Sequence, residues 1–366
     1  MNQSTHGCYA NTRQYEPQSK RKKAHIVQFD FMRAVCALLI VIYHVICMYE
    51  GMDSWSYFPV SSHCVNGDWG HTAVVSVFFM LSGASLYYNY PSLNCKDLKH
   101  FYVKRWLGIF PTFYFVWCYG FLSQILQVRT VLYAGSPLLF LESLLGLDGY
   151  LYYLGVNYTQ VGEWFLGALV LLYAFYPVFC YVYRKWKVLT VFVVTALFLI
   201  NIKLDIFKIS DSDNFITCLF SFMLGMLLLE TRKLYEGKLW VSAISLVMIL
   251  LLFLFPLPTN QVILMILLGF FLFLFLYNIA PWIMKIPVLC RFNRFTSSIS
   301  YEIFLVHHLI IYRFFGYLCE PPATELSVLQ QCGCIIAVCF FSLLVAKMVS
   351  LFMKWFLSLF GSAKKS

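Results

Sequence analysis

The sequence predicts an all-α polytopic membrane protein of about ten transmembrane helices, with both termini in the cytoplasm. Of its 366 residues, 61% are hydrophobic and only 12% are charged, whereas about a quarter of the residues in a soluble domain are charged. Aromatic residues make up 19%, and Tyr and Trp concentrate where transmembrane helices meet the lipid headgroups. The third observation is the placement of the basic residues, which alternates from loop to loop.

Ten apolar segments follow one another, each about as long as a helix needs to cross a hydrocarbon core of about 30 Å. They lie near 28–50, 71–90, 106–126, 164–183, 187–202, 214–230, 239–256, 260–282, 296–318 and 326–350. No internal repeat and no soluble domain interrupts them. We therefore expect one membrane domain over 26–352, between cytoplasmic tails over 1–25 and 353–366.

Lys and Arg gather in every second loop. The basic clusters lie at 20–23, 96–105, 184–187, 232–238, 285–294 and 364–365. Cytoplasmic loops carry the excess of Lys and Arg, so both termini are assigned to the cytoplasm and the number of spans is even. The same pattern accounts for the net charge of +10 without nucleic acid as a partner. The first apolar segment is too long for a cleaved signal peptide, so we expect a multi-pass protein of the cytoplasmic (inner) membrane.

The 13 cysteines are scattered, mostly within apolar segments, and form no paired metal-ligand motif. We therefore expect small buried thiols rather than metal ligands.

Ionisable side chains within a span are costly in hydrocarbon and are candidates for function. The first span contains Asp30, Arg33 and His44. Eleven residues, about three helical turns, separate Arg33 from His44, so both project from nearly the same face, about 16 Å apart along the axis. Asp30 stands three residues before Arg33 and can pair with it. A purely structural interpretation remains open, in which Arg33 reaches the inner headgroups and His44 bonds a neighbouring helix.

Later spans supply further polar groups. Ser82-Gly83 lies near the middle of the second span, where small residues indicate close helix packing or contact with a ligand. Lys104-Arg105 opens the third span, as inner-face anchors or as anion-binding groups. Glu163-Trp164 opens the fourth span at the outer boundary, where Glu163 is either functional or a solvated loop carboxylate.

The ninth span carries Tyr301 and Glu302 in its inner half and the pair His307-His308 near the middle of the bilayer. Adjacent helical residues point in different directions, so at most one of these histidines is expected to share a pocket with His44.

Four segments resemble acyltransferase family 3, a family of membrane-bound O-acyltransferases. The stretch FDFMR at 29–33, followed by His44, resembles the family's opening pattern of Asp, an Arg three residues later and a His eleven after that. FFMLSG at 78–83 resembles its Phe-x-x-Ser-Gly segment, and KRWLGIFP at 104–111 its Arg-x-x-Arg segment ending in Pro. Ile299-Ser300-Tyr301 through His307 resembles its late Ser-Tyr…Leu-x-His segment. The resemblance runs from about 26 to 350.

The resemblance implies an enzyme that moves an acetyl group from cytoplasmic acetyl-CoA to a hydroxyl of a surface polysaccharide or of its lipid-linked precursor. His44 would remove the hydroxyl proton or carry the acyl group transiently. Arg33, held by Asp30, would bind the donor, and His307 or Glu163 would orient His44 or contact the acceptor. The other implied contacts are those of Lys104, Arg105 and Ser82 with acyl-CoA, and those of Trp164 and Tyr301 with the acceptor. Acyl-CoA, a carbohydrate and the bilayer are thus the expected partners, with no bound cofactor and no metal.

Two positions depart from the family pattern. Gly108 stands where the family has the second Arg of Arg-x-x-Arg, and Glu163 stands where members often have His before Trp-Phe-Leu. The tyrosines of the outer loop over 127–162 are expected either to stack on sugar rings or to form an aromatic belt; they are Tyr150, Tyr152, Tyr153 and Tyr158.

Three alternatives remain open. A transporter or flippase would also have ten spans, but broken helices in paired repeats are expected of it and none is evident. A receptor or scaffold would not need Arg33 and His44 aligned on one face. An enzyme with another acyl group, such as succinyl, or with another acceptor remains equally compatible with the residues.

Overall fold

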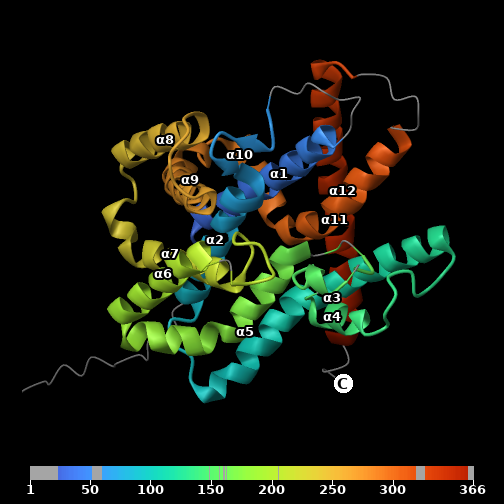
Figure 1. Cartoon of the computed structure of the whole chain (residues 1–366), viewed down its shortest axis with the longest axis horizontal. Coiled ribbons are helices and arrows are strands. Elements are labelled where there is room, and N and C mark those ends of the chain that lie inside the picture. The colour runs from blue at the N-terminus through green and yellow to red at the C-terminus, as the bar shows by residue number, and fades with distance from the viewer. Residues whose placement is uncertain are drawn as a thin grey trace, which may run out of the picture.

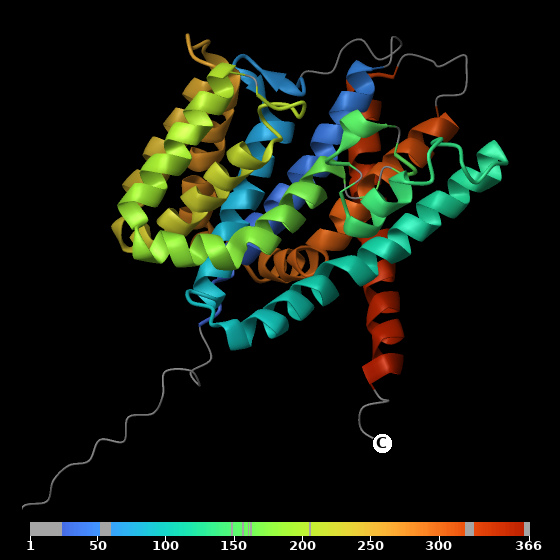
Figure 2. The same ribbon diagram turned by 60° about the horizontal axis from the view of Figure 1, so that its bottom comes forward.

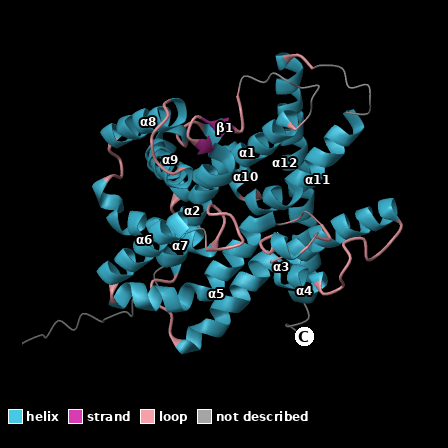
Figure 3. Cartoon of the chain, in the orientation of Figure 1, coloured by secondary structure: helices cyan, strands magenta, loops and turns pink. Residues whose placement is uncertain are grey.

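The computed structural model describes residues 24–51, 60–147, 149–155, 157–159, 161, 163–204, 206–318 and 326–361. Most of the expected N-terminal tail and the last five residues of the expected C-terminal tail, with the basic clusters at 20–23 and 364–365, lie outside these residues. The helices are α1 (Val27–Glu50), α2 (Val75–Asn89), α3 (Cys95–Val128), α4 (Leu139–Leu145), α5 (Glu163–Lys185), α6 (Lys187–Leu204), α7 (Phe215–Thr231), α8 (Leu239–Leu254), α9 (Gln261–Ile283), α10 (Pro287–Ser297), α11 (Ser300–Leu318) and α12 (Val328–Gly361). The all-α class is confirmed: the strands among the described residues are β1 (His63–Cys64) and β2 (Gly67–Asp68), which form one short hairpin (Figure 3).

Among the described residues, eight helices are long and apolar enough to cross a membrane. They correspond to eight of the ten predicted spans, and the other two are also present as helices. One of these, α8, is apolar but has only 16 residues. The other, α11, carries Glu302, His307, His308 and Arg313, which lower its hydropathy. The ionisable residues of α11 therefore lower the mean hydropathy by which a membrane span is recognised in a sequence.

Several boundaries differ from the predicted ones. The third helix begins at Cys95 rather than near 106, because Asn94 and Asp97 form a capping box that starts it early. A separate basic helix, α10, precedes α11, so the ninth span begins at Ser300 and not at 296. The last helix runs on to Gly361, past the boundary at 352, and Figure 2 shows its final turns projecting from the bundle.

The helices pack into two cores that share α1, which lies between α9 and the pair α11 and α12 in Figure 1. The larger core joins α1 to α2, α5, α6, α7, α8 and α9. The smaller core joins it to α3, α11 and α12. Residues at four-residue spacing on α1 point into the smaller core: Ala37, Val41, Val45 and Tyr49. A helix buried on two sides in this way is held rigidly, which suits an element that carries reactive groups.

The closest helix crossing is that of α2 on α7. A Cβ atom on Gly83 would overlap the Phe222 carbonyl, and one on Gly225 would overlap the Met80 carbonyl. Gly83 therefore serves close helix packing, as one of the two interpretations of Ser82-Gly83 expected. The tight contact fixes the position of Ser82, whose side chain faces the other way, into the cavity described next.

Candidate active site

A cavity of about 280 Å³ lies where the two cores meet. It is lined by α1, α2, α3, α5 and α11, together with His71 from the short π-helix η2 (Trp69–Val74). Its volume is just below the range of about 300–1,000 Å³ usual for ligand pockets. Such a space fits a narrow chain better than a whole nucleotide.

One face of α1 forms a wall of this cavity. Arg33, Ala37, Ile40 and His44 recur at helical spacing along it and all line the space. The prediction that Arg33 and His44 project from the same face is therefore confirmed. They mark two ends of the cavity, which we call the basic end and the histidine end.

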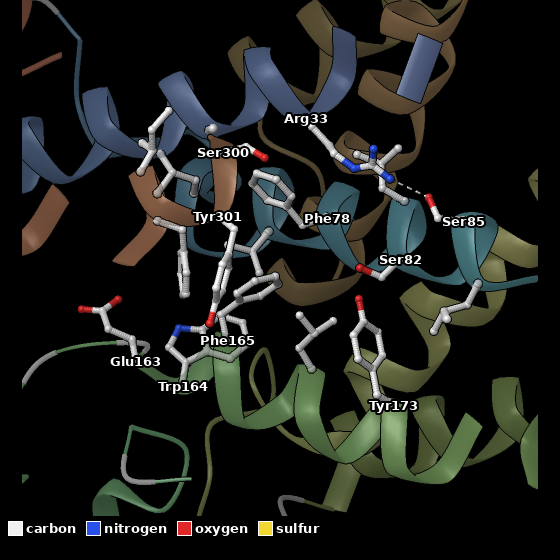
Figure 4. A pocket seen from close by; sticks show the side chains of 18 of the residues that line it. Arg33, Phe78, Ser82, Ser85, Glu163, Trp164, Phe165, Tyr173, Ser300 and Tyr301 are labelled. Carbon is white, nitrogen blue, oxygen red and sulfur yellow. Dashed lines mark hydrogen bonds between the residues drawn. The ribbon is translucent and has the colours of Figure 1, made fainter. Parts of the chain in front are cut away.

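The basic end is built around Arg33. Its Nη1 lies 3.2 Å from Asp30 Oδ1. Its Nη2 donates to Ser85 Oγ at 2.9 Å, the bond dashed in Figure 4. The predicted Asp30–Arg33 pair is thus present. Asp30 holds one terminal nitrogen of the guanidinium and Ser85 holds the other. These two contacts fix the orientation of the Arg33 side chain at the cavity.

Arg105 also lines the basic end, whereas Lys104 does not. The Arg105 guanidinium lies 5.6 Å from the Tyr90 ring and 5.8 Å from the Tyr173 ring, within cation–π range. Lys104 Nζ lies 5.8 Å from Tyr90 as well. Gly108, the position of the family's second Arg, has open space around it and does not line the cavity.

The middle of the cavity is lined with aromatic rings, chiefly Phe78, Phe165 and Phe304, which separate its two polar ends. Tyr301 lines it too, but its hydroxyl donates to the Ile109 carbonyl on α3 at 3.0 Å. Tyr301 therefore ties α11 to α3 and offers the cavity its ring rather than its hydroxyl.

Three imidazoles meet at the histidine end. The His44 ring centroid lies 5.1 Å from that of His307 and 4.2 Å from that of His308. Only His307 of the adjacent pair lines the cavity, as the helical geometry predicted, but both rings contact His44.

The protons of this cluster are partly set by its hydrogen bonds. His307 Nδ1 lies 2.7 Å from the Phe304 carbonyl, which can only accept, so Nδ1 carries a hydrogen. Its other nitrogen, Nε2, is buried and has no hydrogen-bond partner among the described residues. His308 Nε2 lies 2.9 Å from Glu163 Oε1. The carboxylate predicted at the start of the fourth span thus joins the cluster through His308 and is not a solvated loop group.

Glu163 is held there by an unusual backbone. It has a φ of 37°, a left-handed conformation that few residues other than glycine adopt. A Cβ atom on Gly149 would overlap its main chain, so the loop passes closely over the first residue of α5. Strain at a residue inside a cavity is often associated with function.

Among the described residues, the same three histidines are a group that could hold a metal ion, because their ligand nitrogens lie within 4.8 Å of one another. The Glu163 carboxylate, 2.9 Å from His308, gives the cluster a charged neighbour of its own, which favours proton transfer as its use.

Sequence reasoning missed His71. Its Nε2 lies 2.8 Å from Asp213 Oδ1, and its ring lies 5.0 Å from that of Trp164. Both His71 and Trp164 line the cavity. The available signal was an ionisable residue at the first position of a predicted span.

The outer-loop tyrosines do not act as one group. Tyr150 and Tyr158 are buried, and Tyr158 stacks on Phe140 at 4.1 Å. Tyr152 and Tyr153 are exposed. Neither sugar stacking nor an interfacial belt therefore describes all four of them. The described cysteines are free, and Cys36, Cys180 and Cys218 are buried as expected, whereas Cys95 and Cys118 are exposed.

Comparison with known proteins identifies the family. The family model for the acyltransferase domain of acyltransferase family 3 matches residues 26–347, nearly the same range as the resemblance. Comparisons with curated proteins and with solved structures gave no match. The family match covers nearly the whole membrane domain, including both ends of the cavity. The chain therefore belongs to acyltransferase family 3 and is a multi-pass membrane acyltransferase.

Proposed function

We propose that this protein is an O-acetyltransferase of the cytoplasmic membrane. It takes an acetyl group from cytoplasmic acetyl-CoA and transfers it to a hydroxyl of a surface polysaccharide or of its lipid-linked precursor. The observation that carries the proposal is a cavity that joins a basic end to a histidine end along one face of α1. The alternation of basic loops assigns the basic end to the cytoplasm.

The donor is expected to enter from the basic end. Arg33 and Arg105 offer guanidinium groups for the CoA phosphates, with Lys104 as a nearby charge. Ser82 lines the path between the ends. Because the cavity is narrow, the nucleotide remains near the cytoplasmic surface while the acyl-pantetheine arm extends along α1 toward His44.

The chemistry takes place at the histidine end. His44 removes the proton of the acceptor hydroxyl as its oxygen attacks the thioester carbonyl, or first takes the acyl group itself. In the direct route the tetrahedral intermediate then expels the CoA thiolate, which receives the proton from His44. His307 and His308 pack against His44, and Glu163 stabilises positive charge in the cluster. Trp164 and the ring of Tyr301 lie where an acceptor would contact the cavity.

The test compares O-acetyl signals of the surface glycan by proton NMR. Cells lacking the gene are complemented with the wild type, with His44→Ala or with His63→Ala, at matched protein levels in the membrane. His63 is an exposed histidine outside the cavity and serves as the control. We expect acetyl signals to vanish on deletion and to return with wild type and His63→Ala only.

Two other results would contradict the proposal. Full acetylation by His44→Ala would remove His44 from the reaction. Acetylation unchanged by deletion would exclude this donor group or acceptor and favour another acyl group, another acceptor or a transporter.

A further inference from the structure

A second histidine centre lies beside the first, at the end of the cavity away from the basic loops. His71 is placed by η2, a six-residue π-helix that joins the β1–β2 hairpin to α2. Such helices are rare and frequently occur at functional sites. Asp68 caps it by accepting from the His71 backbone N–H at 2.8 Å, and a Cβ atom on Gly70 would overlap the Tyr43 ring. The segment is therefore held tightly against α1.

The His71 side chain is oriented by a carboxylate from a distant part of the chain. Its Nε2 lies 2.8 Å from Oδ1 of Asp213, two residues before the first residue of α7. The Asp213 side chain is only 6% exposed, and Ser212 Oγ donates to the same oxygen at 2.6 Å. Because a carboxylate accepts, Nε2 carries the hydrogen, and Nδ1 of neutral His71 is left with a lone pair. A buried carboxylate that fixes the tautomer of a histidine is a recurring arrangement for a general base.

An aromatic surface lies against this dyad. The Trp164 ring is 5.0 Å from the His71 ring and tilted by 38°, and it also packs against Phe79 at 6.1 Å. A large ring held by packing presents a flat apolar face with a polar edge. A sugar ring, apolar on its C–H face and polar at its hydroxyls, fits a Trp face beside a histidine nitrogen.

We propose that His71, Asp213 and Trp164 form the acceptor subsite, in which a sugar hydroxyl is bound and deprotonated by His71. The inference rests on the proposed function and assigns different steps of the reaction to His44 and His71. His44 attacks the thioester carbonyl, and the CoA thiolate leaves and takes the proton that the acylated imidazole releases. The acceptor hydroxyl then gives its proton to His71 Nδ1 as its oxygen attacks the acyl carbon. As the bond to His44 breaks, the proton returns from His71 to the His44 nitrogen.

The two half-reactions can be measured apart. The full-length protein in lipid nanodiscs is given acetyl-CoA labelled in the acetyl group. Transfer of label to protein reports the donor half-reaction. Transfer of label to surface glycan, purified from cells lacking the gene and therefore free of this modification, reports the acceptor half-reaction.

We expect His71→Gln to keep the donor half-reaction and to lose about 100-fold or more in transfer to glycan, the range typical of a general base. Asp213→Asn should lose transfer to a smaller extent, and Trp164→Ala should raise the apparent KM for glycan with little change in kcat. His44→Ala should lose both half-reactions. The control is His63→Gln, an exposed histidine of the same outer hairpin, which should behave as wild type.

Two results would overturn the acceptor subsite. One is transfer to glycan by His71→Gln at the wild-type rate. The other is an equal loss of both half-reactions in a His71→Gln protein whose thermal unfolding matches the wild type, because that would place His71 on the donor side. Failure of the wild type to use acetyl-CoA or the glycan at all would instead contradict the proposed function, so the two failures are distinguishable.

Discussion

At the scale of single residues, Arg33 shows how much a guanidinium does that an ammonium cannot. Its two terminal nitrogens reach Asp30 and Ser85 in different directions, and only a planar group with several donors holds both while facing the cavity. A lysine would retain the positive charge but not the fixed orientation of the hydrogen-bond donors.

Arg33→Lys is therefore expected to raise the KM for acyl-CoA by about tenfold, equivalent to about 1.4 kcal/mol, with a smaller effect on kcat. Steady-state kinetics in nanodiscs measure this. Arg129→Lys, at an exposed position outside the cavity, is the matched control and should leave KM unchanged. An unchanged KM in Arg33→Lys would exclude Arg33 from donor binding.

Glu163→Gln preserves the size of the side chain but removes the negative charge 2.9 Å from His308. Because the reaction places positive charge on the histidine cluster, we expect transfer to fall by about 100-fold while thermal unfolding changes little. Glu163→Asp keeps the charge and should recover part of the rate. Equal rates for the Gln and Asp variants would show that the charge is not used.

Sequence reasoning found most of these residues because their signals are local. The Asp30–Arg33 pair and the shared face of Arg33 and His44 follow from helical spacing alone. The contact of both His307 and His308 with His44, and the His71–Asp213 pair, depend on how distant helices pack. No periodicity in the sequence contains that information.

At the scale of elements, the crossing of α2 and α7 depends on two glycines. Gly225→Ala places a methyl group into the Met80 carbonyl, so the helices must separate. We expect a loss of about 3 kcal/mol in the free energy of unfolding, the upper part of the range for overpacking, measured by unfolding in mixed detergent micelles.

Gly333→Ala provides the matched control, because it lies in helix α12 with no atom within 4 Å of the added Cβ. It should be neutral or stabilising by up to about 1 kcal/mol, the helix-propensity gain of Ala over Gly. Equal stability of both variants would show that the α2–α7 contact is looser than described.

The helices themselves were largely predictable, because hydrophobic length marks a span. The exceptions have physical reasons. The early start of α3 comes from a cap, and α10 is a short polar helix with Arg291 and Arg294 that no span signal detects. The left-handed backbone of Glu163, at the start of α5, lies against the loop at Gly149. The amino-acid composition gives no indication of this contact.

At the scale of the whole molecule, the assignment of sides determines which end of the cavity meets acyl-CoA. We expect a single cysteine at Cys95, in a background with the other cysteines replaced, to react with a membrane-impermeant maleimide only after the cells are opened. His63→Cys in the same background should react in intact cells. The reverse pattern would place the basic end outside and contradict cytoplasmic acyl-CoA as donor.

The helix order around α1 was beyond sequence reasoning. The loops allow many arrangements, and only side-chain packing selects the one in which the first and eleventh helices share a cavity. The sequence predicted a polar path through the membrane domain, but not which helices line it.

This arrangement has a consequence for biosynthesis. His44 is translated about 260 residues before His307, which at about 5–20 residues per second is a delay of roughly 13–50 s. Throughout that interval α1 carries His44 in the membrane without the partners that α11 will bring. A nascent chain of this protein therefore needs its first helix to be retained beside the insertion machinery, or shielded by a chaperone, until almost the whole polypeptide has been made.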